Sequence, residues 1–173
     1  MNEQLLHNIQ ATIDLTAEEV DVLSSFWKQR AIAKNDYLLR NGEICKYDSF
    51  VISGSFKASY LHHKTGKEEI LFFAIEDWWA TDLNSFYQQE PSLYNIQALE
   101  NAVVEQISYP SFEKLMRTIP KMERYFRIIL QSYTASIQKR IILTNAHTAA
   151  ERYDHFLKKY PKMVQTIPQY RSF

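Results

Sequence analysis

Hydrophobic positions with a helical period run through the stretch from residue 120 to residue 145. After Pro120 this stretch contains neither glycine nor proline, so nothing in it forbids one long helix. At about 100° per residue, its apolar side chains form a broad arc on one side and a second line on another side. The arc consists of Met122, Tyr125, Phe126, Ile129, Leu130, Tyr133, Ile137, Ile141 and Leu143, and the second line of Ile128, Ala135 and Ile142.

A helix with two apolar faces needs two partners. We expect one face to pack on the helix's own domain and the other to pack on the same helix of a second subunit. A helix buried inside one monomeric core would show a similar pattern, so that alternative stays open. The expected dimer interface comprises Ile128, Ala135, Ile142, Tyr125 and Ile129.

Between about residues 29 and 108 the pattern changes to short runs rich in β-branched and aromatic residues. Gly42, Gly54 and Gly66 fall in this region twelve residues apart, where each would let the chain turn at positive φ. Short strands with evenly spaced turns are typical of an antiparallel sandwich, roll or barrel. The strands are expected at 31–33, 37–39, 49–52, 56–61, 69–74, 94–99 and 102–107.

Helices are predicted on both sides of the strand region. The pattern Thr-x-x-Glu occurs at 16–19 and again at 148–151, and each copy is a capping box that marks a helix start. Strands and helices that are segregated along the chain indicate the α+β class. The shorter helices are expected at 2–9, 17–27, 110–117 and 149–159.

The composition is that of a folded domain. The chain of 173 residues is 46% hydrophobic and 14% aromatic, enough for one packed domain with at most a small appendage. It has no run of 18 apolar residues and no basic segment followed by an apolar one at its start, so we expect a cytoplasmic protein without a membrane span. The single cysteine, Cys45, cannot form an internal disulfide and is expected to be buried.

The net charge of zero hides an uneven distribution. Residues 1–112 carry 8 Lys+Arg against 16 Asp+Glu, whereas residues 113–173 carry 12 against 4. A basic end favours a polyanionic partner, although lysines that only solvate helix faces would give the same count.

A metal-dependent enzyme is the main rival class for a small β-roll, and the histidine pattern argues against it. The five histidines show neither His-x-His nor His-Glu-x-x-His spacing, and the neighbours His62 and His63 would face opposite ways on a strand. No Gly-rich phosphate loop and no Gly-x-Ser-x-Gly elbow is present. We therefore expect no enzyme, no catalytic residue, no metal and no cofactor.

The order of these elements, together with five stretches of sequence, resembles the Crp–Fnr transcription regulators, in particular their cytoplasmic Bacteroidetes-type members. The resemblance covers about residues 5–170, and the phrase Glu76-Asp77-Trp78-Trp79 is its most specific part. The five stretches are LRNGEICKY (39–47), FVISGSFKASY (50–60), ILFFAIEDWWATDLNSF (70–86), YNIQALENAVVEQIS (94–108) and TAAERYDHFLKKYP (148–161).

This resemblance implies three parts. A cyclic-nucleotide-binding-like β-roll would occupy residues 1–119, a dimerisation helix residues 120–147, and the incomplete start of a winged-helix DNA-binding domain residues 148–173. The roll would be an antiparallel double-stranded β-helix, or jelly roll, flanked by N-terminal helices and by the long C-terminal helix.

The phosphate-binding cassette of the family corresponds to residues 76–98 and departs here from the cyclic-nucleotide pattern. Binders have Gly-Glu for the ribose and Arg-Ser/Thr for the phosphate, whereas this sequence has Ala80-Thr81-Asp82 and Ser92-Leu93-Tyr94. Between Lys67 and Lys114 there is no Lys or Arg at all. We therefore expect cAMP and cGMP not to bind.

Aromatic and neutral polar residues stand where the cations would be, which suits an uncharged or aromatic small ligand. The alternative is that the aromatic side chains only fill the former pocket and that nothing binds. The expected ligand-binding residues are Phe72, Trp78, Trp79, Thr81, Asp82, Ser85, Tyr94 and Asn95.

The DNA-binding end of the family would begin at the helix 149–159, where the expected DNA contacts are Arg152, Lys158 and Lys159. A helix-turn-helix needs roughly 20 residues, and the sequence stops at Phe173 before a reading helix, so we expect a truncated chain or a natural short form. Two functions follow. The chain is the effector-sensing and dimerising part of a Crp–Fnr-like transcription regulator, or it is a dimeric small-ligand-binding or interaction module without sequence-specific DNA binding.

Overall fold

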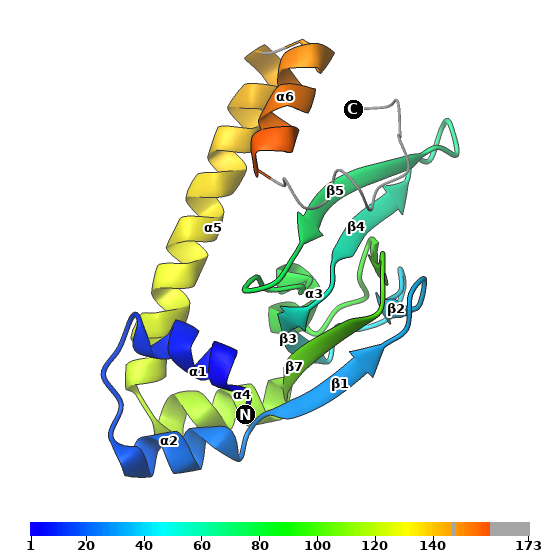
Figure 1. The fold of residues 1–173 in the computed structure, drawn as a ribbon. Helices are drawn as coiled ribbons and strands as arrows, with labels where there is room; N and C mark the ends of the chain where they lie inside the picture. Colours follow the sequence, from blue (N-terminus) through cyan, green and yellow to red (C-terminus); the bar gives the residue numbers. More distant parts are fainter. Residues whose placement is uncertain (147, 160–173) are drawn as a thin grey trace. The chain divides into compact units, whose positions relative to one another are not determined.

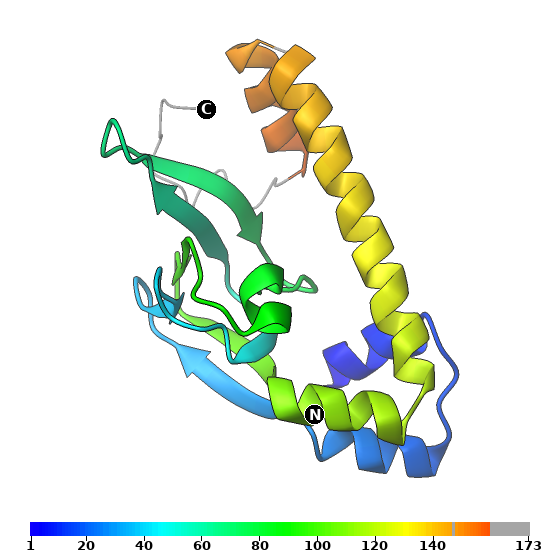
Figure 2. The ribbon, with the colours of Figure 1, turned by 180° about the vertical axis from the view of Figure 1, so that it is seen from behind.

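Two compact units make up the computed structural model, which describes residues 1–146 and 148–159 (Figure 1; Figure 2). The first unit comprises residues 1–123 and contains every strand of the described chain. The second begins at Arg124 and contains most of α5 (Lys121–Ala146) and α6 (Ala149–Lys159). Within the described residues, no helix is both long and apolar enough to cross a lipid bilayer.

Seven strands in the described chain form two antiparallel sheets. The first sheet has the order β1-β7-β3 and the second the order β2-β6-β4-β5. Each strand lies where the sequence pattern predicts one, with its ends shifted by a few residues at most. The strands are β1 (Lys28–Ile32), β2 (Tyr37–Leu39), β3 (Tyr47–Ser53), β4 (Phe56–Leu61), β5 (Glu68–Ala74), β6 (Asn95–Ala98) and β7 (Ala102–Ser108).

The connection from β3 in the first sheet to β4 in the second turns at Gly54. This glycine has a φ of +84°, and a Cβ built on it would lie 2.7 Å from the Cβ of Ala102 at the start of β7. Beside it, the Ser55 carbonyl accepts the N–H of Leu99 at 2.9 Å, and the Ser55 hydroxyl donates to the Glu100 carboxylate at 2.6 Å. The connections β3–β4 and β6–β7 are thereby joined at one corner of the roll, which we call the crossover corner.

Helices cover one face of the first sheet. Val51 and Val104 are paired across β3 and β7 and are fully buried, and their neighbours along the strands, Phe50 and Ile107, are fully buried on the opposite face. α1 lies against β3 and α4 lies against β7. The helices of the first unit are α1 (Glu3–Gln10), α2 (Ala17–Ser24), α3 (Leu83–Gln88) and α4 (Tyr109–Thr118).

The capping box before α2 is present as predicted. The Thr16 hydroxyl accepts the N–H of Glu19 at 3.2 Å, and the Glu19 carboxylate accepts the N–H of Thr16 at 2.8 Å. The helix nevertheless ends at Ser24 instead of the predicted residue 27, because the hydroxyls of Ser24 and Ser25 bond to carbonyls of the preceding turn. Trp27 is therefore buried in the connection to β1 and not on the helix.

Only the start of α5 is buried within the chain. Met122, Tyr125 and Phe126 are buried, whereas from Arg127 onward the described side chains are half-buried or exposed. The chain itself thus covers only the first members of the predicted broad arc, and the later members remain accessible.

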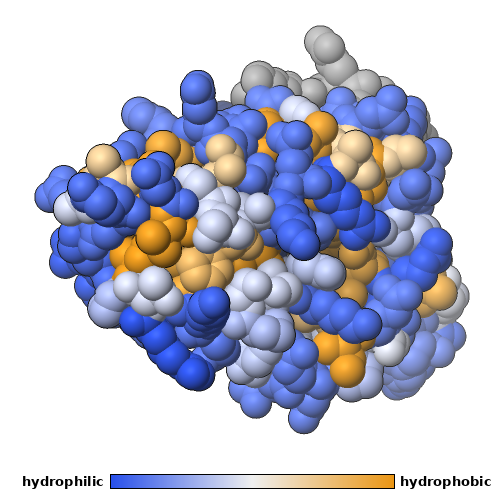
Figure 3. All heavy atoms as spheres, turned by 90° about the horizontal axis from the view of Figure 1, so that it is seen from below, coloured by the Kyte–Doolittle hydropathy of each residue, from blue (hydrophilic) through white to orange (hydrophobic). Residues whose placement is uncertain are grey.

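The face seen in Figure 3 is mostly hydrophilic, with apolar areas separated by charged side chains. Isolated apolar side chains on a surface are ordinary and need no explanation. On α5, by contrast, exposed apolar side chains lie near one another along the helix. Among the described residues, the large apolar side chains that are exposed are Val22, Ile44, Tyr47, Leu61 and Leu93 in the first unit, and Tyr133, Ile141 and Ile142 on α5.

Candidate ligand-binding site

The segment between β5 and α3 runs alongside β3, which is an edge strand of the first sheet. The N–H of Val51 donates to the Trp78 carbonyl at 2.9 Å, and the Asp77 N–H donates to the Val51 carbonyl at 3.0 Å. Further on, the Ala80 N–H donates to the Ser49 carbonyl at 2.8 Å. These bonds fix the backbone that carries several predicted ligand residues.

Asp82 connects both ends of the loop that contains α3. Its Oδ1 accepts the N–H of Ser85 at 3.1 Å as the N-cap of the helix, and its Oδ2 accepts the hydroxyl of Ser92 at 2.6 Å. Both Asp82 and Ser92 are buried. The resemblance assigns these two positions to ribose and phosphate contacts in cyclic-nucleotide binders, and here the two side chains bind each other.

The other predicted polar residues also have partners inside the protein. The Ser85 hydroxyl donates to the Glu90 carbonyl at 2.5 Å and accepts the N–H of Cys45 at 2.8 Å. The Thr81 hydroxyl donates to the buried carboxylate of Asp48. Buried polar groups need such partners, so these residues hold the segment in place.

The predicted aromatic residues make ring contacts in two groups. Trp79 lies against Trp27, with ring centroids 5.9 Å apart, and against Phe50 at 5.4 Å. Phe72 contacts Tyr94 edge-on at 6.1 Å. Phe72, Trp78, Trp79 and Tyr94 are all half-buried, so part of each ring of the predicted set is exposed at the surface.

Asn95 begins β6 and is joined to the turn after β2. Its Oδ1 accepts the N–H of Asn41 at 2.9 Å, and the Asn41 amide donates to the Leu93 carbonyl at 2.7 Å. This predicted ligand residue therefore also has a structural partner.

Burial changes the ionisation of three groups around α3. It raises the pKa of Asp48 to about 7, an effect opposed by the hydrogen bonds from Thr81 and Ser49. It also raises the pKa of the Cys45 thiol to about 11, which keeps the thiol neutral at physiological pH and slows its reactions. Burial, with nearby carboxylates, raises the pKa of Tyr87 as well. No cation appears among the causes of these shifts.

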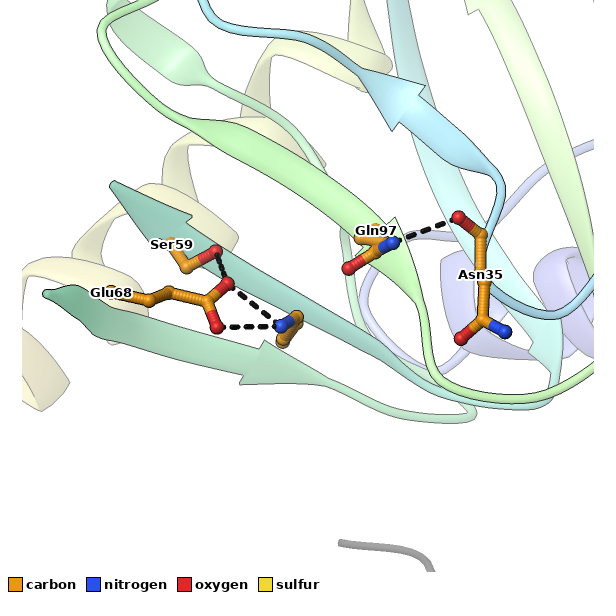
Figure 4. A network of polar contacts seen from close by, with 5 residues as sticks. Asn35, Ser59, Glu68 and Gln97 are labelled. Atoms are coloured by element: carbon orange, nitrogen blue, oxygen red, sulfur yellow. Dashed lines mark hydrogen bonds and ion pairs between the residues drawn. The ribbon is translucent and has the colours of Figure 1, made fainter. Parts of the chain in front are cut away.

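The sequence between Lys67 and Lys114 carries no cation. On β4, Lys57 is bound by the Glu68 carboxylate at 2.7 Å, and Glu68 also accepts the Ser59 hydroxyl at 2.6 Å (Figure 4). Gln97 on β6 donates to the Asn35 carbonyl at 2.8 Å (Figure 4). The Lys57 ammonium is thus already paired, and a phosphate at the cassette would meet carboxylates.

A cavity in the described part of the chain lies elsewhere. Its volume is about 450 Å³, and it is lined by residues of β1, β2, β3, β6 and β7 and of the turn before β3. It includes Ala80 and Ile96 from the cassette but none of the eight predicted ligand residues. Among the residues that the structure describes, no three His, Cys, Asp or Glu side chains are grouped to hold a metal ion.

The sequence profile of the family described as "Cyclic nucleotide-binding domain" matches residues 29–119. The chain belongs to this family. A cyclic nucleotide-binding domain from Methylobacillus flagellatus is 18% identical with a TM-score of 0.70, covering 84% of this chain and 84% of that one. The catabolite activator protein of Thermus thermophilus is 17% identical with a TM-score of 0.65, covering 80% of this chain and 63% of the other. The predicted jelly roll with N-terminal helices and a long C-terminal helix is thereby confirmed.

Curated relatives of this cyclic nucleotide-binding domain are regulators. The "Anaerobic regulatory protein" of Haemophilus influenzae is 28% identical over 153 residues, which are 86% of this chain and 57% of the relative. The "Transcriptional activator protein anr" of Pseudomonas aeruginosa is 26% identical over 148 residues, 84% and 59% respectively. The chain thus spans a little over half the length of these relatives. The resemblance to Crp–Fnr regulators is confirmed, and its Bacteroidetes-type detail stays a prediction.

The predicted dimer residues differ in accessibility. Ile142 is 64% exposed, Ala135 is exposed, and Ile128 and Ile129 are half-buried. Tyr125 is fully buried, so it offers no surface to a second subunit, and its place in the predicted interface is corrected. Its position in the first turns of α5, next to buried Met122 and Phe126, explains the difference.

The predicted DNA contacts lie on α6. Lys158 is exposed, whereas the side chains of Arg152 and Lys159 lie outside the described residues. The predicted winged-helix start at 148–173 is described only as far as residue 159. The division of the chain into parts 1–119, 120–147 and 148–173 therefore stays a prediction.

Two residues of the site were not predicted from sequence, Asp48 and Ser92. Asp48 stands on β3, more than thirty residues before its partner Thr81, and no local motif joins them. A signal for Ser92 did exist, because it replaces a charged residue at one end of the cassette while Asp82 stands at the other. Without that arginine, a buried Asp82 needs another hydrogen-bond donor, and the Ser92 hydroxyl provides it.

Proposed function

We propose that this cyclic nucleotide-binding domain is the effector-sensing and dimerising part of a cytoplasmic Crp–Fnr-like transcription regulator that does not take cAMP or cGMP. The family match and the regulatory relatives support the first part of this proposal. The second part depends on one observation, the hydrogen bond between Ser92 and Asp82.

A cyclic phosphate needs a cation at its binding site, ideally the planar fork of an arginine. At the matching place this chain has a serine whose hydroxyl is bonded to a carboxylate. Lys57 on β4 is held by Glu68, and the buried Asp48 adds a carboxyl group and no cation. Such surroundings oppose a dianionic or monoanionic phosphate.

For the effector we propose an uncharged or aromatic small molecule. The half-buried rings of Phe72 and Tyr94, which contact each other edge-on, support this, because aromatic rings stack favourably with such a molecule. The polar members of the predicted site, Asp82 and Ser85 among them, hold the loop around α3 through their own hydrogen bonds.

For the dimer we propose that two α5 helices pair through Ile128, Ala135 and Ile142. These residues are seven apart and are not buried by the chain itself. An effector that favours one arrangement of paired α5 helices would change the direction in which α6 and the basic residues that follow α5 are presented to DNA.

Two measurements test this proposal. Calorimetric titration with cAMP and cGMP should give no binding heat up to about 1 mM, where a weak site would already show. In repeated selection from a random DNA duplex pool, enrichment of a two-fold symmetric sequence would support the regulator. Salt-sensitive binding without enrichment, or no binding, would favour the other function, a dimeric ligand-binding or interaction module that does not read sequence.

A further inference from the structure

The cavity of about 450 Å³ lies between the two sheets, away from the cassette rings. Its floor is one face of the first sheet and carries the buried Gln106 and Ser49, and the exposed Arg30 of β1 is on the same face nearer the surface. Ser49 and Gln106 are paired directly across β3 and β7, and Arg30 is paired with Val104, two residues from Gln106, so the three side chains share one face.

The opposite side of the cavity is apolar. Leu39 of β2 and Ile96 of β6 are buried there, and Cys45 contributes a neutral thiol. The space is left open because two of the lining residues are small. Ser49 and Ala80 are each only 1% exposed, and neither has a side chain large enough to fill the space between the sheets.

The mouth of the cavity is positive. Arg30 and Lys46 line it and are exposed, and neither forms an ion pair with a described residue. The acidic lining residue, Glu43, already accepts the N–H of Arg40 at 3.1 Å. Two cations against one occupied carboxylate leave an excess of one positive charge.

A buried polar pair stands on the floor. The Gln106 amide donates to the Ser49 hydroxyl oxygen at 2.9 Å, and both side chains are buried. This bond uses an acceptor position of Ser49 and leaves its hydroxyl hydrogen to be donated. A ligand that reaches the floor therefore finds a hydrogen-bond donor whose position is fixed by Gln106.

We propose that this cavity binds a small monocarboxylate with an apolar tail. The tail lies against Leu39, Ile96 and Ala80, and the carboxylate is held at the mouth by Arg30 and Lys46, where an arginine fork matches two carboxylate oxygens. The volume is within the range of small-molecule pockets. None of the eight predicted ligand residues lines this cavity. The proposal goes beyond the proposed function, because it does not depend on whether the chain reads DNA.

Amide NMR of the full chain with octanoate, and with octanamide as a neutral probe of the same shape, tests this. We expect octanoate to shift the backbone signals of Ser49, Ala80 and Ile96 saturably and octanamide to bind at least about tenfold more weakly. Arg30→Gln should weaken octanoate about tenfold and leave octanamide unchanged. Arg117→Gln, which removes an exposed arginine of α4, is the matched control and should change neither.

Alkylation of the single thiol gives a second measurement that needs no variant. Octanoate in the cavity should slow the reaction of Cys45, which lines it, and octanamide at equal concentration should not. The proposal is overturned if octanoate does not saturate, if it shifts Phe72 and Tyr94 in place of the cavity residues, or if the acid and the amide bind equally. It is also overturned if a folded Arg30→Gln variant binds octanoate as the unmodified chain does.

Discussion

The Ser92 hydroxyl donates a 2.6 Å hydrogen bond to the Asp82 carboxylate, and neither side chain is more than 4% exposed. The same carboxylate caps α3 through the N–H of Ser85. One buried acid thus fixes both the start of the helix and the return of the chain toward β6. The cassette is thus held by hydrogen bonds between its own residues.

Asp82→Ala should lower the free energy of unfolding by roughly 2–4 kcal/mol. The loss of an N-cap costs about 1 kcal/mol, and a buried hydroxyl left without its partner costs about 1–3 kcal/mol more. Urea denaturation measures the change. Asp14→Ala, at an exposed aspartate, is the control and should change stability by no more than about 0.5 kcal/mol. Equal effects of the two substitutions on the free energy of unfolding would show that the hydrogen bonds of Asp82 do not stabilise the fold.

Asp48 should make the stability of the roll depend on pH. Burial raises its pKa from 3.8 to about 7, so the folded protein binds a proton that the unfolded chain releases. The resulting stabilisation is complete below about pH 4 and is lost as the pH rises through about 7. Asp48→Asn should therefore flatten the pH dependence of the thermal midpoint over this range and be the more stable protein at about pH 8.

Asp14→Asn is the matched control for this series, because the Asp14 side chain is exposed. Its midpoints should follow the same pH dependence as those of the unmodified protein. If the Asp48→Asn curve also runs parallel to that of the unmodified protein, then Asp48 does not take up a proton on folding.

Gly54 and Gly42 should respond differently to alanine. Both have nearly the same positive φ, +84° and +85°, but a Cβ on Gly54 meets Ala102 at 2.7 Å whereas one on Gly42 meets nothing within 4 Å. Gly42→Ala should cost only the strain of the backbone, about 1 kcal/mol. Gly54→Ala adds a clash with backbone and should cost several kcal/mol more or prevent folding, as urea denaturation would show. Similar losses of stability at both positions would show that the close approach of Ala102 to Gly54 does not restrict this position.

Ile128→Glu, Ala135→Glu and Ile142→Glu should each turn dimers into monomers in sedimentation velocity. Each would bury an unpaired charge at the proposed seam of two α5 helices. Thr134→Glu is the control, since it is exposed and lies about 100° around the helix from Ala135. A dimer that survives all three substitutions would reject this face, and a chain that is monomeric without any substitution would reject the dimer itself.

Periodicity found the strands and the long helices because each of these elements depends on its own local pattern. The stretch after Pro120 is one helix, Lys121–Ala146, as its lack of glycine and proline indicates. α3 was not placed from sequence, because its six residues are too few for a period and its start depends on Asp82, whose partner Ser92 lies ten residues further on. Trp27 was misplaced for a similar reason, since serine hydroxyls end α2 before it.

The candidate site was harder to predict than the fold. Residue type alone marked Thr81, Asp82 and Ser85 as polar groups in an aromatic segment, and this is correct. What the sequence could not show is that each is bonded to a residue of the fold, such as Asp48 on a strand more than thirty residues away. The cavity near Arg30 was not predicted either, because strands far apart in the sequence and from both sheets enclose it.

The crossover corner at Gly54 has a consequence for how the domain comes apart. Two of the chain's crossings between the sheets, β3–β4 and β6–β7, are connected there, through the close approach of Gly54 to Ala102 and the bonds of Ser55 with Leu99 and Glu100. Separating the strands of either sheet at this corner would therefore break contacts that also hold the strands of the other sheet. The amides of β3, β4, β6 and β7 should therefore lose their protection against deuterium together, as one cooperative unit, and not sheet by sheet.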